Sequence, residues 1–198
     1  MILTAASKLE FVQRAAIPRL LQSELCITPT PDGILSREKT ILVKPGTMLP
    51  DPRYPIFSLT GLPAQGLTHL FSYLSDSFKF IALFFIADHI LHEPHPVFER
   101  FAIICKPYAS VLRPVILART YRVGGFRRPD WAAGYKNILF LSTNNTSTEK
   151  EYGLDGVKQM GLVIVRPDGY IAYSTLIDPS GSAFAKADRY LSTILLKH

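Results

Sequence analysis

A run of ten residues, FKFIALFFIA at 78–87, constrains the fold more than any other part of the chain, because it is apolar at every position except one lysine. A helix that crosses a membrane needs about 18 apolar residues or more, so this run is too short to span one. Continuous apolar runs of this length are typical of central strands that are covered on both faces. The run therefore predicts an α/β sheet with this strand in its middle.

The segments that follow this run alternate in type. We expect a helix from Pro94 to Cys105, with Pro94 in the first turn, where the missing amide hydrogen costs nothing. A second strand is predicted at 111–118, and Pro114 favours an edge position or a bulge for it, because proline cannot donate to a neighbouring strand. A third, short strand is predicted at 137–141.

The segment GLVIVRPDGYIAY at 161–173 is predicted to form a β-hairpin, since Pro167 and Gly169 both suit a tight turn between two apolar strands. A final amphipathic helix is expected at 182–196. The order of elements is thus a βαβ half joined to a ββα half, which is the thioredoxin topology. The right-handed crossover rule places the first helix on one face of the sheet.

The chain is predicted to have two parts, an arm at 1–53 and a thioredoxin-like domain at 54–198. Apolar residues at helical spacing predict an amphipathic helix at 4–16. Six prolines at 27–55 indicate an irregular, extended segment after it. Within the domain, a short helix is expected at 67–74 before the central strand.

The net charge of +6 comes from 22 Lys plus Arg against 16 Asp plus Glu, and the basic residues are scattered along the chain. Their densest cluster is Arg119, Arg122, Arg127 and Arg128. A protein that binds nucleic acid gathers its cations on one face together with stacking aromatic residues. We therefore expect a basic surface and no nucleic-acid partner.

Two cysteines, Cys26 and Cys105, lie 79 residues apart, and neither belongs to a CxxC motif. A chain of this length does not need a disulfide, so we expect a reducing compartment, the cytoplasm. We expect no membrane segment, because no apolar run reaches the ~18 residues that a span requires. Residues 1–21 are amphipathic and basic, as in a mitochondrial presequence, but Glu10 and Pro18 are untypical of one.

Four stretches resemble the C-terminal thioredoxin-like domain of the phenol 2-monooxygenase (phenol hydroxylase) family of flavin-dependent aromatic hydroxylases. They are KPGTMLP at 44–50, FKFIALFFIAD at 78–88, EYGL at 151–154 and GLVIVRPDGYIAY at 161–173. They follow one another in the order found in that family and span most of the chain from residue 44 to residue 197. The RPDGY turn beside the strand that ends in Asp88 is the most specific of these features.

The resemblance implies a module for interaction rather than for hydroxylation. In the larger enzymes of the family, FAD and the hydroxylation site lie in an N-terminal region, and the thioredoxin-like domain contributes to dimer contacts. This chain has no GxGxxG motif and no room for that region, so we expect no cofactor. The expected partner is a second copy of the chain, or a flavin monooxygenase that lacks this domain, in aromatic or secondary metabolism.

The residues after the central strand read Ala87-Asp88-His89-Ile90-Leu91 and include no cysteine. Thioredoxin-type chemistry needs a thiolate at the start of the following helix, so we expect a redox-inactive domain. Asp88 and His89 are the candidate catalytic residues, with His89 as general base, because ligands bind at the carboxyl ends of strands in open sheets. The alternative is that Asp88 caps the next turn and His89 lies at the surface.

His89, His92 and His95 occur at a spacing of three, which on one helix face suits two ligands of a metal ion. Pro94 and Pro96 interrupt any helix there, and no further ligand cluster follows. We therefore expect no metal site.

A second candidate site, for a ligand or a partner, comprises Arg122, Arg127, Arg128 and Trp131 in the long insertion. Arginine and tryptophan are frequent anchors of protein interfaces. The alternative is a loop whose tryptophan covers the edge of the core.

Two functions remain open from the residues. The first is a dimerisation or partner-docking module of the phenol hydroxylase type. The second is a small cofactor-free enzyme of the isomerase or cyclase type, or a ligand-binding protein, which holds an aromatic small molecule in a pocket at the end of the central strand.

Overall fold

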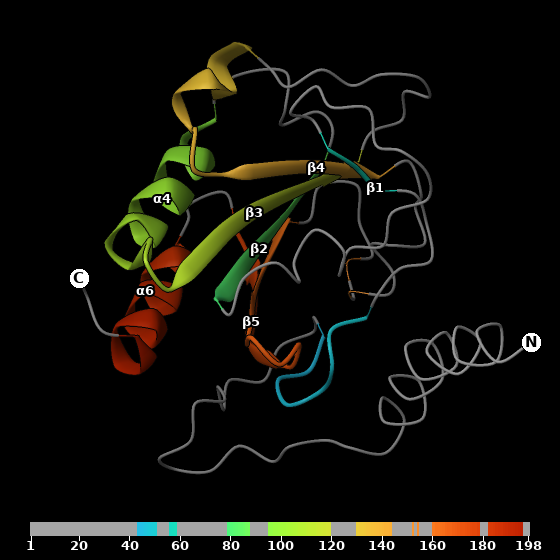
Figure 1. Ribbon diagram of the computed structural model, residues 1–198, viewed down its shortest axis with the longest axis vertical. Helices are drawn as coiled ribbons and strands as arrows, with labels where there is room; N and C mark the ends of the chain where they lie inside the picture. Colours follow the sequence, from blue (N-terminus) through green and yellow to red (C-terminus); the bar gives the residue numbers. More distant parts are fainter. Residues whose placement is uncertain are drawn as a thin grey trace, which may run out of the picture.

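The computed structural model shows a mixed six-stranded sheet with two helices packed on one of its faces (Figure 1). It describes residues 43–50, 56–58, 79–87, 95–119, 130–143, 152, 154, 160–178 and 182–195. Along the chain, the elements are β1 (Ile56–Ser58), β2 (Phe80–Ala87), α4 (Pro96–Cys105), the 3-10 turn η1 (Lys106–Tyr108), β3 (Leu112–Arg119), the 3-10 turn η2 (Asp130–Gly134), β4 (Leu139–Thr143), β5 (Met160–Val165), β6 (Ile171–Ile177) and α6 (Ser182–Ile194). None of the helices in these ranges is long and apolar enough to cross a membrane.

The strand order is β1-β4-β3-β2-β5-β6, so the predicted central strand does lie in the interior of the sheet. β2 pairs in parallel with β3, and β3 pairs in parallel with β4. On its other side β2 pairs antiparallel with β5, which pairs antiparallel with β6. The unit β2-α4-β3 is followed by the hairpin β5-β6 and the helix α6, which confirms the predicted βαβ and ββα order.

The prediction that Pro114 would place its strand at an edge or a bulge was wrong, because β3 lies between β2 and β4 and its register with both strands is regular. Pro114 pairs with Ala82 of β2, whereas the ladder to β4 begins one residue later, at Val115 and Leu139. The missing amide hydrogen therefore falls at a position where β3 has only one neighbouring strand. Proline is typical of positions where a strand has a neighbour on one side only.

The helix α4 begins at Pro96, two residues later than predicted, and Pro94 lies outside the described residues. His95 is its N-cap: the amide of Val97 donates to the imidazole Nδ1 at 3.3 Å. The amide of Phe98 donates to the carbonyl oxygen of His95 at 3.0 Å. Proline suits the first helical position because the amide it lacks would have no partner inside the helix.

The core has two halves, one on each face of the sheet, because neighbouring side chains of β2 point to opposite faces. Ala82, Phe84 and Ile86 pack toward α4 and α6, which lie side by side on that face (Figure 1). The ring of Phe84 is at the centre of this half. Its centroid lies 5.1 Å from that of Phe101, 5.6 Å from that of Phe184 and 6.4 Å from that of Phe98.

The opposite face carries the alternate side chains of β2, which are Ile81, Leu83 and Phe85. Tyr152 is fully buried against this face, with its ring centroid 4.5 Å from that of Phe85. Both faces of β2 are therefore buried, and the prediction of a strand covered on both sides is confirmed.

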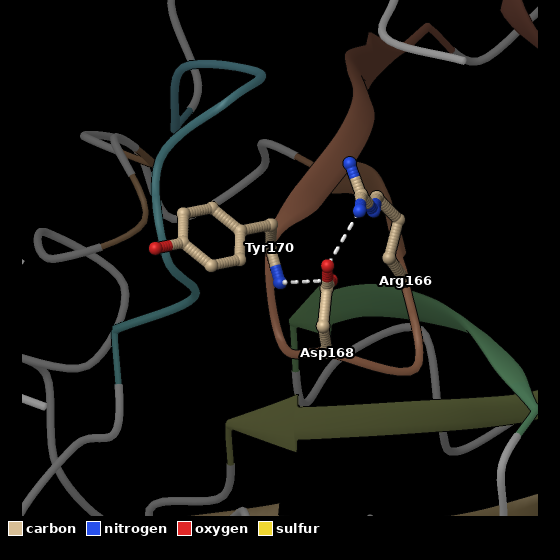
Figure 2. Close-up of polar contacts among 3 residues, drawn as sticks. All are labelled: Arg166, Asp168 and Tyr170. Atoms are coloured by element: carbon tan, nitrogen blue, oxygen red, sulfur yellow. Dashed lines mark hydrogen bonds and ion pairs between the residues drawn. The ribbon is translucent and has the colours of Figure 1, made fainter. Parts of the chain in front are cut away.

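The turn between β5 and β6 is held by hydrogen bonds within Arg166–Tyr170 (Figure 2). The amide of Arg166 donates to the carbonyl oxygen of Tyr170 at 2.8 Å, and the amide of Gly169 donates back to Arg166 at 3.0 Å. The Asp168 carboxylate accepts the amide of Tyr170 at 3.3 Å and forms an ion pair with Arg166. Gly169 has a φ of 86°, a value that side chains disfavour, and the predicted hairpin is confirmed.

Residues 43–50 pack against this hairpin, although the prediction assigned them to the arm. Ile171 of β6 accepts the amide of Gly46 and donates its own amide to Thr47, both at 2.8 Å. Ser174 donates its hydroxyl to the carbonyl oxygen of Val43 at 2.6 Å. The division at residue 53 stays a prediction, and the helices expected at 4–16 and 67–74 lie outside the described residues.

Candidate functional site

The three parallel strands end at the same edge of the sheet and in register. Ala87, the last residue of β2, is paired with Arg119, the last residue of β3. Arg119 is in turn paired with Thr143, the last residue of β4. Neighbouring strands are about 4.8 Å apart, so these three residues lie in a short row. We call this row the carboxyl edge, and in open α/β sheets it is the place where ligands bind.

Asp88 and His89, the predicted catalytic residues, lie outside the described residues but follow Ala87 directly in the chain. Their catalytic roles stay predictions.

Arg122 follows Arg119, the last residue of β3, by three positions in the sequence. Arg127 and Arg128 are farther along the same segment, and all three predicted residues lie outside the described part of the chain. Arg119 itself was noted only as part of a charge cluster. The pairing that puts it in the middle of the carboxyl edge joins residues more than 20 positions apart, so no local signal marks it.

Trp131, the remaining predicted site residue, packs beside the first turn of α4 and is partly exposed. Its ring centroid lies 4.6 Å from that of Phe98, with the two planes inclined at 32°. The rings of Tyr135 and Phe140 meet it edge-on at 6.1 and 6.4 Å. This packing matches the alternative in which the tryptophan covers the edge of the core, and a binding role for its exposed part stays a prediction.

A second group of titratable residues lies away from the carboxyl edge, where α6 packs on β6. The rings of Tyr173 and Tyr190 stack with centroids 4.9 Å apart. Burial raises the pKa of Tyr190, and the nearby Arg166 partly offsets this effect. Tyr108 is also buried, and its hydroxyl has no hydrogen-bond partner among the residues that the structure describes. Burial is the larger cause that raises the pKa of Tyr108, and the charge of Asp188 is the smaller one. The phenols of Tyr108 and Tyr190 are both protonated at neutral pH.

Solved structures similar to this one share its arrangement of strands and helices. AhpC of Mycobacterium tuberculosis has a TM-score of 0.53 at 15% identity, and the match covers 78% of this chain and 99% of that chain. Peroxidoxin BcpB from the same organism has a TM-score of 0.51 at 22% identity, over 77% and 96% of the two chains. A domain of a possible thiol-disulfide isomerase from Cytophaga hutchinsonii has a TM-score of 0.51 at 14% identity, over 77% and 98%.

The chain has a thioredoxin-like fold. At these identities the likeness shows the fold alone, and it confirms the predicted fold class. No family model matches the sequence, and no curated protein matches it.

The described part of α4 has no cysteine at its start. The described start of α4 reads His95-Pro96-Val97, and the residues that link it to Ala87 contain no cysteine. Cys105 lies at the other end of α4 and is buried. Burial raises the pKa of its thiol far above the usual range, so the thiol stays protonated and is a poor nucleophile.

His95 forms the N-cap of α4, and of the three histidines at a spacing of three it is the one that the structure describes. Its Nδ1 accepts a hydrogen bond from Val97, so that nitrogen already has a partner. His89 and His92 lie outside the described residues. Among the described residues, no group of three or more His, Cys, Asp or Glu side chains could hold a metal ion.

Proposed function

We propose that this chain is a redox-inactive thioredoxin-like module of the phenol hydroxylase type, which forms a homodimer or docks on a flavin monooxygenase. The observation that carries the proposal is the start of α4. Where the fold places its reactive thiolate, this chain has a histidine cap followed by proline. Cys105 is ten residues further on and buried, so a role in binding is favoured over one in catalysis.

Three of the four stretches that resemble the phenol hydroxylase family also contact one another, which supports the proposal. Tyr152 donates its hydroxyl to the carbonyl oxygen of Pro50 at 2.6 Å. Leu49 donates its amide to Gly169 of the RPDGY turn at 2.9 Å. Segments about 100 residues apart in the chain thus form one packed unit with Phe85 of the fourth stretch. The residues of these stretches must therefore fit against one another, as expected of motifs that define one domain.

The same proposal places the protein in a reducing compartment, the cytoplasm, in a pathway that handles aromatic compounds. Cys105 is a free thiol in the structure. A free buried thiol is compatible with a reducing environment. The link to aromatic metabolism rests on the sequence resemblance alone.

The first test is native mass spectrometry of the full chain, purified gently from its own host. We expect a homodimer, or a complex with a second protein that carries a flavin, visible by its absorbance. A monomer that persists at high protein concentration and carries no second protein would contradict the docking role.

The redox part of the proposal is tested separately by a disulfide reduction assay with dithiothreitol and a disulfide-bonded protein substrate. We expect the full chain to give no acceleration over the reagent alone. An acceleration that disappears in Cys105→Ala would show that the thiol is reactive after all.

A second candidate function is favoured by the alignment of the three strand ends. It is a small cofactor-free enzyme of the isomerase or cyclase type in which Asp88 and His89 transfer protons. The row formed by Ala87, Arg119 and Thr143 is where such a site belongs in this topology. The variant His89→Ala should then lose turnover of its substrate while keeping the wild-type circular dichroism spectrum, and full activity in this variant would exclude the role.

A further inference from the structure

The outward side of α4 carries a row of four residues that are not part of the buried core. They are Glu99, Ala102, Ile103 and Lys106, and we call them the α4 stripe. Their spacing of i, i+3, i+4 and i+7 places them on one face of a helix. Lys106 belongs to this face, because its amide donates to the carbonyl oxygen of Ala102 and its backbone is helical.

The centre of the α4 stripe is apolar and open to solvent. The side chain of Ile103 is 59% exposed, and it is the one large hydrophobic residue that is exposed in the part of the chain that the structure describes. Trp131 is partly exposed beside it and stacks on Phe98, which lies one turn before Ala102 on the same side of α4. Tyr135, also partly exposed, meets the indole edge-on. The exposed parts of these two rings widen the apolar centre, and aromatic residues are enriched in protein interfaces.

The two ends of the α4 stripe carry opposite charges. Glu99 is in the first turn of α4, and Lys106 directly follows its last residue. The helix dipole favours this order of charges, but it does not account for an exposed isoleucine between them. At about 1.5 Å of rise per residue, each charge lies roughly 5 Å along the axis from the midpoint between Ala102 and Ile103. A two-fold axis that passes this midpoint at right angles to the helix would therefore place each charge opposite its counterpart of the other sign.

We propose that the α4 stripe is the interface of a homodimer, in which α4 packs antiparallel against α4 of a second copy of this chain. Glu99 of each copy then faces Lys106 of the other, and Ile103 packs across the two-fold axis, as in an interface formed by the same surface of both subunits. This inference rests on the proposed function: it selects the second copy as the partner and names the surface that binds it.

The size of the stripe sets the expected strength of the dimer. α4 has ten residues and is thus about 15 Å long, so a contact through this helix and the adjoining rings is smaller than most stable interfaces. We therefore expect a Kd on the order of 10 µM, which rises with salt concentration because exposed charges are screened.

The test is sedimentation velocity of the full chain over a range of concentrations around this Kd, with charge-reversal variants. Lys106→Glu places two carboxylates opposite each other at both contacts, and Glu99→Lys places two ammonium groups there. We expect each to weaken the homodimer by roughly tenfold or more. An equimolar mixture of the two variants should associate again, because every contact then joins opposite charges.

Two further variants complete the design. Ile103→Ser leaves the charges unchanged and should also weaken the dimer by roughly tenfold, since it removes the apolar centre. The matched control is Lys44→Glu, which makes the same charge change as Lys106→Glu. Lys44 is exposed and belongs to the segment that pairs with β6, apart from α4 (Figure 1). This control should keep the Kd of the wild type within about twofold.

Recovery on mixing separates the proposed contact from damage to α4, because two misfolded variants would not restore each other. The circular dichroism spectrum of each variant should match that of the wild type. A mixture that associates no more than its two components, or wild-type dimerisation by both charge variants, would overturn the antiparallel pairing. If a charge variant does not fold, wild-type dimerisation by Ile103→Ser overturns the interface.

The same measurements distinguish this inference from the proposed docking function. A wild-type dimer that none of the substitutions weakens would refute the α4 interface and leave the docking module standing on another surface. A wild-type monomer that copurifies with a flavoprotein would refute the homodimer and retain the docking role. A monomer without any partner would refute both.

Discussion

Tyr152 offers the sharpest test of whether residues 43–50 belong to the cooperative fold of the domain. Its side chain is fully buried, and its hydroxyl donates to the carbonyl oxygen of Pro50 across 102 positions of sequence. Tyr152→Phe keeps the ring on Phe85 and removes only the donor. Breaking a buried hydrogen bond from one side costs about 1–3 kcal/mol. Pro50 is partly exposed, so we expect water to hydrate its carbonyl oxygen in the variant and the loss to be about 1 kcal/mol of unfolding free energy.

Urea unfolding of the full chain, followed by circular dichroism, measures this loss. With a slope of about 2 kcal/mol per molar urea, the midpoint of Tyr152→Phe should fall by roughly 0.5 M at an unchanged slope. The matched control is Tyr170→Phe, since the hydroxyl of Tyr170 points away from Asp168 and Arg166 (Figure 2). That variant should stay within about 0.5 kcal/mol of the wild type.

Equal midpoints for the two variants would show that the contact between Tyr152 and Pro50 contributes nothing to stability. Tyr152→Ala gives a second check, since it also removes the ring that packs on Phe85. We expect it to cost about 3–5 kcal/mol, as other deletions of buried aromatic rings do.

Three further predictions concern the thiol, the stacked phenol and the hairpin turn. In Cys26→Ser, the thiol of Cys105 should resist a thiol reagent until denaturant unfolds the chain, because burial raises its pKa and blocks access. Above pH ~10, the unfolded phenol of Tyr190 ionises while the folded one stays protonated, so stability falls as pH rises, and Tyr190→Phe should show a smaller fall in alkaline urea titrations. Gly169→Ala should lose about 1 kcal/mol in thermal unfolding, because the φ of 86° strains any side chain.

Much of the sheet could be predicted because its signals are local. The apolar run at 78–87 reports burial on both faces through composition alone, and the residues of the hairpin turn carry their own conformational preference. The predictions failed where two local signals fitted the same role equally well, or where the contact that decides the structure joins residues far apart in the sequence. Pro94 and Pro96 both suit a first helical turn, and the hydrogen bond from Val97 to His95 decides between them.

The position of Pro114 depends on where another strand begins. Nothing near this proline in sequence shows that β4 joins β3 only at Val115 and Leu139. The candidate site was likewise hard to predict, because it depends on residues that are far apart in the sequence. Asp88 could be predicted at the end of a strand, but the row that includes Arg119 and Thr143 exists only through the pairing of three separated segments.

The start of α4 differs from a helix N-terminus that is open to an anion. A helix N-terminus usually binds anions through its free amide hydrogens. Here Pro96 has no amide hydrogen, that of Val97 is bonded to the His95 side chain, and that of Phe98 is bonded to the His95 carbonyl. The first three positions of α4 therefore offer no free amide hydrogen that could be donated to a thiolate or to a bound carboxylate.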